Sequence, residues 1–196
     1  TIENTSITAN QSFEDVSLFV DGNGSNNAVY LASNGVTVKA SAGTSVGDYG
    51  VINGDIYTIK DKFQLAADIE VGNDVTKVCT SLITDMSYMC NIPDFNQYIS
   101  SWDTSNVTNM TAMFNNSPFD RDISTWDTSN VTNMNRMFLG ATDFNQDLSS
   151  WSVDGVTICG LFSDGTTQWT LPQPNLNCNT ANGVYLDANG ITVKAI

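Results

Sequence analysis

A block of about two dozen residues repeats through the middle of this 196-residue chain. The segment Val107-Thr-Asn-Met-Thr-Ala-Met-Phe114 returns as Val131-Thr-Asn-Met-Asn-Arg-Met-Phe138, and Trp102, Trp126 and Trp151 follow a step of 24 and then 25 residues. A unit of this length cannot bury an apolar face by itself, so neighbouring units must stack. The repeat therefore predicts a stacked array whose core consists of rows of Trp, Ile, Phe and Met side chains.

Each unit divides into two halves with different periodicities. Residues 107–114 carry apolar side chains at helical spacing, and Ser105 and Asn106 before them are good helix-capping residues. Residues 99–104 alternate apolar or small side chains with polar ones, as a short strand does. One short strand and one short helix per repeat of 24–25 residues predict an α/β solenoid of leucine-rich-repeat character, with β-hairpin regions on its flanks.

The repeat pattern FNxDISxWDTSNVTNMxxMF resembles the short repeat of the BspA-family leucine-rich-repeat surface proteins of mycoplasmas, listeriae and Bacteroidetes. The resemblance covers approximately residues 75–162. It implies a cell-surface or secreted protein associated with adhesion, and it implies no catalytic activity. The terminal units depart from the pattern, with Cys79 in place of the Asp and Cys159 in place of the first Met. Such atypical ends are expected of capping repeats.

Both flanks carry hairpin signals. Asn34-Gly35 separates two runs rich in β-branched residues, Asn53-Gly54 does the same, and Asp61–Ile69 predicts a short helix. These patterns divide the chain into a β-rich junction segment at residues 1–40, an N-terminal cap of hairpin and helix at 41–82, the repeat solenoid with its C-terminal cap at 83–178, and a terminal β-hairpin at 179–196.

A second, longer duplication links the two ends of the chain. Asn27–Ala40 nearly reappears as Asn182–Ala195. Either residues 182–196 begin another module, or the terminal β segments join one subunit to the next by strand pairing. The second interpretation marks as assembly strands Val29, Tyr30, Leu31, Val184, Tyr185 and Leu186.

The charge of the chain excludes one class of partner. Seven Lys and Arg face 21 Asp and Glu, a formal net charge of −14, and nucleic-acid phosphates require clustered basic residues. The chain has no histidine, which removes Ser-His-Asp and Cys-His catalytic sites. No apolar run reaches the ~18 residues of a membrane-spanning helix. The partners that remain are proteins or glycans on a surface, neighbouring copies of the same module, and cations.

The four cysteines favour disulfides in an oxidising compartment, because their number is even and the chain is acidic and rich in Asn and Thr. None of them forms a CxxC pair, which argues against zinc. We expect the bonds Cys79–Cys90 and Cys159–Cys178, which would clamp the two ends of the array. The alternative is four buried free thiols.

Stacking places equivalent residues about 4.8 Å apart, so Asp103 would lie over Asp127 and Asp122 over Asp147. A bound calcium ion would relieve the repulsion between these like charges, and the alternative is solvated or turn-capping carboxylates. Asp21 and Asn23 resemble the start of a calcium loop, with a plain turn as the alternative. No other cofactor is expected. The polar row expected to face a ligand contains Ser101, Asp103, Ser105, Thr125, Asp127 and Ser129.

These patterns lead to three functional hypotheses. The first is a non-enzymatic extracellular module of a surface protein, adhesive or structural, which presents a polar solenoid face to a protein or glycan. The second is a subunit of an extracellular filament assembled through the duplicated terminal segments. The third, an enzyme that uses a pair of carboxylates, is weakest because the acids follow the repeat and do not converge on one cleft.

Overall fold

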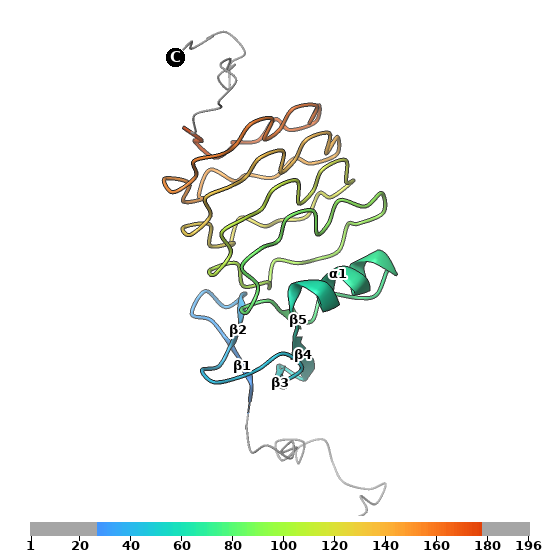
Figure 1. Ribbon diagram of the computed structural model, residues 1–196, viewed down its shortest axis with the longest axis vertical. Coiled ribbons are helices and arrows are strands. Elements are labelled where there is room, and N and C mark those ends of the chain that lie inside the picture. Colours follow the sequence, from blue (N-terminus) through green and yellow to red (C-terminus); the bar gives the residue numbers. More distant parts are fainter. Residues whose placement is uncertain (1–26, 178–196) are drawn as a thin grey trace, which may run out of the picture.

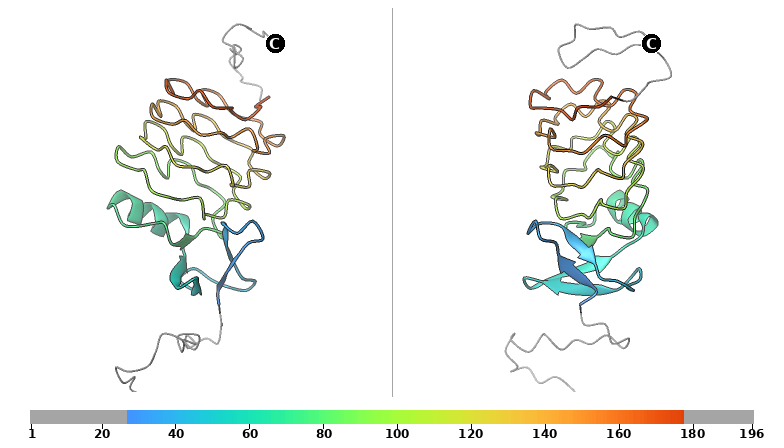
Figure 2. Two further views of the ribbon diagram at one scale, coloured as in Figure 1. Left: turned by 180° about the vertical axis from the view of Figure 1, so that it is seen from behind. Right: turned by 90° about the vertical axis from the view of Figure 1, so that its left-hand side faces the viewer.

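The structure, a computed structural model, describes residues 27–177. A stack of coils rises from an N-terminal unit of short strands and one helix (Figures 1 and 2). In this unit, strands β1 and β2 form an antiparallel hairpin, and β3, β4 and β5 form a three-stranded sheet in which β4 and β5 are parallel. The strands are β1 (Val29–Leu31), β2 (Val38–Ala40), β3 (Tyr49–Ile52), β4 (Asp55–Ile59) and β5 (Val78–Cys79).

Turn chemistry explains both hairpins. Gly35, in the loop between β1 and β2, has a φ of 70°. Between β3 and β4, Asn53 and Gly54 have φ values of 54° and 88°, a left-handed pair that matches the twist of the flanking strands. The two Asn-Gly dipeptides therefore lie at the turns that the sequence predicts.

Helix α1 (Lys62–Glu70) forms in the segment that the sequence predicts to be a short helix, and it lies across the first coil (Figure 1). The side chain of Asp61 accepts a hydrogen bond from the backbone N–H of Gln64 at 2.9 Å and caps the helix. Leu65 and Ile69 are buried in the core of the coils. The helix therefore covers apolar side chains at the end of the stack that water would otherwise reach.

The β1–β2 hairpin shares a small apolar core with the sheet. Ala28, Val29 and Val38 of the hairpin region cluster with Ile59 and Cys79. The boundary predicted between residues 40 and 41 therefore falls inside a packed unit, because the apolar side of the hairpin needs the sheet to exclude water.

Apolar rows run through the whole stack and form its core. Trp102, Trp126 and Trp151 stack in register, with ring centroids 6.4 Å apart and ring planes inclined by 6° at each step. The other buried rows are Ile99 and Ile123, Phe95, Phe119 and Phe144, Met110 and Met134, Met113 and Met137, and Phe114 and Phe138.

The predicted short helices at 107–114 and 131–138 do not form: residues 107–110 and 131–134 are extended, with a bridge in each, and residues 111–116 and 135–140 form consecutive turns. Met113 N donates to Met110 O, three residues back, and Ala112 between them has a left-handed φ of 51°. Turns of this length return apolar side chains to the core every three or four residues, which is also the spacing of a helix. The periodicity was therefore correct and the backbone conformation was not.

The backbone bonds along the stack are those of a parallel ladder. Alternate amides donate to the next coil: Met110 N to Asn133 O at 2.8 Å, and Ala112 N to Asn135 O at 2.9 Å. Residues 99–104, where the sequence predicts the strand, form turns and extended backbone. The leucine-rich-repeat class of this stack stays a prediction. Parallel bridges join one residue of each coil to the next, through Asp85, Asn109, Asn133 and Ile158.

The polar residues of the repeat also connect coils. The indole N–H of Trp126 donates to Ile99 O at 3.1 Å. The hydroxyl of the buried Thr104 donates to Asp127 O at 2.9 Å. The indole bond is buried and the Thr104 hydroxyl comes from a buried side chain, so each consensus side chain supplies a partner that the backbone does not provide.

We predict that Thr104→Val destabilises the fold by about 1–2 kcal/mol, because it keeps the shape of the side chain but leaves the Asp127 carbonyl without its donor. Urea unfolding followed by tryptophan fluorescence measures the effect. Thr108→Val is the matched control, since the Thr108 hydroxyl makes the same kind of bond to Thr84 O at an exposed position. Equal losses for the two variants would contradict the role assigned to the bond of the buried Thr104.

The cysteines bear out one predicted feature and correct another. Cys79 and Cys90 are free and buried, so the predicted bond between them is wrong. They belong to different apolar clusters, the hairpin core and the core of the coils. Cys159 is disulfide-bonded, and Cys178, its predicted partner, lies outside the described residues.

Thiol counting tests this assignment. Burial raises the pKa of the Cys90 thiol well above its ordinary value and, against hydrogen bonds from Ser81, also raises that of Cys79. We therefore expect the native protein to resist alkylation, since the thiolate is the reactive form. In denaturant without reductant, two thiols per chain should react, and mass spectrometry should place them at Cys79 and Cys90.

Candidate binding face at the hairpin junction

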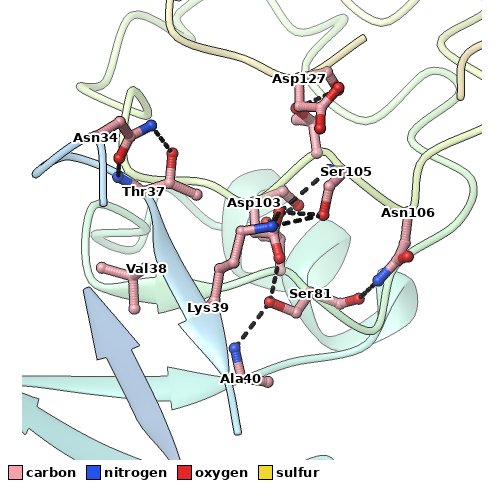
Figure 3. Close-up of polar contacts among 12 residues, drawn as sticks. Asn34, Thr37, Val38, Lys39, Ala40, Ser81, Asp103, Ser105, Asn106 and Asp127 are labelled. Carbon is pink, nitrogen blue, oxygen red and sulfur yellow. Dashed lines mark hydrogen bonds and ion pairs between the residues drawn. The ribbon is translucent and has the colours of Figure 1, made fainter. Parts of the chain in front are cut away.

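Strand β2 lies beside the first Trp-Asp-Thr-Ser segment and brings a lysine to its carboxylate. Lys39 Nζ is 3.3 Å from Asp103 Oδ1 and 3.0 Å from Ser105 Oγ (Figure 3). The Asp103 side chain is 3% exposed and that of Lys39 is 30% exposed. The pair joins residues far apart in the sequence and neutralises a buried charge, which an isolated repeat would leave unpaired.

A serine of the preceding coil completes the contact. Ser81 Oγ donates to Asp103 Oδ2 at 2.5 Å and accepts from Ala40 N at 2.9 Å (Figure 3). Val38 N donates to Ser101 O at 2.9 Å. The hairpin is therefore attached to the first two coils through its backbone as well as through its lysine.

The carboxylate of Asp103 stays ionised because its partners outweigh its burial. Burial acts to raise the pKa of Asp103, but hydrogen bonds from Ser81 and Ser105 and the charge of Lys39 bring this pKa below its ordinary value. Asp103 Oδ1 also accepts from the backbone N–H of Ser105 at 3.1 Å. The junction is thus a network in which the charge is fully hydrogen-bonded.

A hollow of about 180 Å³ opens between the hairpin tip and the coils. Asn34 holds the tip in shape: its Oδ1 accepts from the backbone N–H of Thr37 at 3.0 Å, and its Nδ2 donates to the hydroxyl of Thr37 at 2.9 Å (Figure 3). The rim is therefore ordered by local hydrogen bonds. The hollow is lined by Ala32, Ser33, Asn34, Thr37, Lys39, Trp102, Asp103, Thr104, Thr125 and Asp127.

Only half of the residues in the predicted ligand row are exposed to solvent. In the coil that contains Asp103, this residue is buried and Ser101 and Ser105 are half-buried, because the hairpin covers them. The expectation that Asp103 faces solvent is wrong for this reason. In the next coil the residues at the same positions, Thr125, Asp127 and Ser129, are exposed.

The aspartates predicted as calcium ligands cap their own turns. Asp127 Oδ1 accepts from Ser129 N at 3.0 Å, and Asp147 Oδ1 accepts from Ser149 N at the same distance. The structure does bring both predicted pairs together: Asp103 and Asp127 line the junction hollow, and Asp122 and Asp147 line a second hollow of about 390 Å³. Among residues 27–177, no group of three His, Cys, Asp or Glu side chains is arranged to hold a metal ion. Calcium binding stays a prediction.

The predicted assembly strand at the N-terminal side forms β1. Val29 is buried against the sheet, whereas Tyr30 and Leu31 are exposed. The remaining predicted residues, Asp21, Asn23, Val184, Tyr185 and Leu186, lie outside the described residues.

Sequence reasoning missed the lysine that organises the junction. The sequence pattern places Lys39, Asn34 and Thr37 in a hairpin and gives them no further role, and Ser81 falls at the serine of the repeat, two residues after the departure at Cys79. One signal was present: Asn34, Thr37 and Lys39 all recur in the copy at 182–195. Polar residues kept in a duplicated hairpin point to shared contacts, which lie within the turn for Asn34 and Thr37 and outside the hairpin for Lys39.

The chain belongs to the DUF285 family, described as Mycoplasma protein of unknown function, whose model matches residues 57–170, more than half of the sequence. The match begins in β4 and includes α1 and the coils. It agrees loosely with the resemblance to mycoplasma surface repeats, and the BspA family itself stays a prediction. No curated protein and no solved structure matches the chain significantly. In the described part of the chain, no helix has the length and apolar character needed to cross a membrane.

The Asp103 network predicts a specific loss of stability in acid. Because the pKa of Asp103 is lowered on folding, its ionised form stabilises the protein above the unfolded value of about 4, and this contribution is lost as the pH falls through the lower folded value. Asp103→Asn should cost about 1–3 kcal/mol at pH 7 and flatten the fall in stability between about pH 5 and pH 2.

Urea unfolding at a series of pH values measures this effect. Asp127→Asn is the matched control, since it makes the same change at the equivalent, exposed position of the next coil. The assignment fails if Asp103→Asn leaves the pH dependence of the unfolding free energy unchanged.

Proposed function

We propose that this chain is a non-enzymatic repeat module of an extracellular surface protein, with a repeat region of leucine-rich-repeat type that presents a polar face to a glycan or protein. The DUF285 match supports the coarse part of this proposal, a repeat protein of mycoplasma type. The adhesive role is supported by the geometry of the hairpin junction.

An extracellular location is supported by cysteine chemistry and by charge. Cys159 is disulfide-bonded, and disulfides persist mainly in oxidising compartments. The net charge of −14 keeps such a surface soluble and repels nucleic acid.

One observation carries the binding proposal: the junction hollow has exposed polar groups on one wall and an ordered hairpin on the other. Thr125 and Asp127 are exposed on the wall formed by the coils, and Asn34 and Ser33 lie on the wall formed by the hairpin. A carboxylate, hydroxyls and an amide that converge on one small hollow suit the paired hydroxyls of a sugar ring or a polar side chain of a protein. The hollow is fixed by the Lys39–Asp103 contact, so little ordering is required on binding.

We expect the double variant Thr125→Ala/Asp127→Asn to lose at least about tenfold in affinity for saccharides that the wild-type protein retains on a glycan array, since it removes two hydrogen-bonding groups from the hollow. The control is Ser150→Ala/Asp147→Asn, which makes the same kinds of change in the second hollow. Circular dichroism verifies that both variants are folded. A wild-type protein that binds no saccharide would exclude the glycan, and equal losses for both variants would exclude this hollow.

A filament subunit is the second candidate, and one observation favours it. Residues 182–195 repeat the sequence of the hairpin that is packed against the first coils. A chain with two copies of one docking element and a described docking surface has the parts needed for association between copies.

A further inference from the structure

The duplicated segment keeps most of the residues through which the first hairpin is attached. Ten of the fourteen positions from 27 to 40 are identical in 182–195. Two of the four differences, at Ala32 and Ser33, lie at the hairpin tip. The other two replace Val36 by an isoleucine and the buried Ala28 by Gly183. The residues that contact the coils or order the turn, Asn34, Thr37, Val38, Lys39 and Ala40, recur as Asn189, Thr192, Val193, Lys194 and Ala195.

The surface that receives these residues is here called the hairpin seat and consists of Cys79, Ser81, Ser101, Asp103 and Ser105. Four of its residues bond the hairpin with a hydroxyl, a carbonyl or a carboxylate (Figure 3). Cys79 Sγ lies 3.5 Å from the carbonyl oxygen of Val38 and packs beside that side chain in the apolar cluster. The seat therefore recognises a Val-Lys-Ala strand by shape, charge and backbone together.

The next coil has no complete second seat. Asp127 and Ser129 repeat the acid and one hydroxyl. However, the place of Cys79 is taken there by Asp103, so a valine from a second hairpin would meet a carboxylate in place of an apolar surface. The full set of contacts described for the seat is made on the first two coils, where β1–β2 lies.

We propose that residues 182–195 of a second copy occupy the hairpin seat in place of β1–β2, with Lys194 paired to Asp103, so that copies associate head to tail. This inference rests on the filament candidate and names its contact. Such an interface is heterologous, because two different surfaces meet in it. It extends into open chains of copies except where the rotation between neighbours closes a ring. Its occupant is specified by the identity of ten residues. Val193, Lys194 and Ala195 are the copies of the three residues that bond the seat, and Val184 is the copy of Val29, which lies in the apolar cluster of the resident hairpin.

Competition between the two segments sets the concentration at which copies associate. The resident hairpin belongs to the same chain, so it competes with an effective concentration in the millimolar range. The wild-type protein therefore exchanges only when concentrated. A change that weakens the resident hairpin and spares the seat shifts the balance toward the second copy.

Lys39→Glu is that change, because it places a second negative charge beside Asp103 in the resident hairpin only. We expect it to lower the concentration for half-association by about tenfold or more, as measured by sedimentation velocity, because the resident charge pair is lost while Lys194 still provides one. Lys77→Glu is the control: it makes the same charge change in a surface ion pair with Asp55, at 47% exposure, in the same N-terminal unit. In the double variant Lys39→Glu/Lys194→Glu, the concentration for half-association should no longer be lowered.

A peptide measurement keeps the proposal testable if Lys39→Glu does not associate with itself. A synthetic peptide of residues 179–196 should bind the folded Lys39→Glu protein, and the same peptide with Lys194→Glu should not. A folded Lys39→Glu protein that binds neither peptide nor itself, or one that associates equally with Lys194→Glu present, overturns the proposal. Filaments that persist by electron microscopy in the double variant would support a filament subunit that uses a contact other than the seat. Peptide binding without filaments would support the seat and reject the filament.

Discussion

The fold depends on hydrogen bonds between coils. A coil of this kind has few backbone partners within itself, so alternate amides such as those of Met110 and Ala112 donate to the coil that follows. The side chains of the repeat supply the remaining donors: the Trp126 indole and the Thr104 hydroxyl bond carbonyls of neighbouring coils. Each bond requires a fixed step along the chain, because a shifted register would leave buried carbonyls unpaired. This requirement explains why polar residues of the repeat recur as regularly as the apolar rows.

A stack built in this way must end, and its N-terminal end is closed by two different devices. Helix α1 covers the apolar side chains of the first coil with Leu65 and Ile69. The β1–β2 hairpin covers the polar side and brings Lys39 to Asp103. Cys79 replaces the aspartate of the repeat at the position that contacts Val38, where a carboxylate would be buried in an apolar cluster without a partner. The first unit departs from the repeat for this reason.

The same constraint decides where function can reside. Most residues of the repeat pattern are committed to bonds between coils or to turns, including the aspartates that cap Ser129 and Ser149. The positions that can still meet a partner are exposed ones beside the hairpin: Thr125, and Asp127, whose Oδ1 caps the turn of Ser129 and whose side chain is exposed. The proposed binding hollow and the proposed hairpin seat both depend on the contact between Lys39 and Asp103. The hollow lies beside this contact, and in the proposed association the lysine of a second copy replaces Lys39 in it.

The sequence by itself determined the repeat length, the buried rows, the two Asn-Gly turns and the helix that begins after Asp61, since each of these depends on spacing or on local conformational preference. It did not determine the backbone of the coils, because consecutive turns and a helix give apolar residues the same spacing. It also favoured a disulfide over free thiols at Cys79 and Cys90, since which apolar cluster each enters is decided by packing. Only the tertiary structure brought Lys39 beside Asp103: an ion pair between residues 64 positions apart leaves no local pattern, and it forms because the hairpin needs an apolar surface to cover and the buried carboxylate needs a cation.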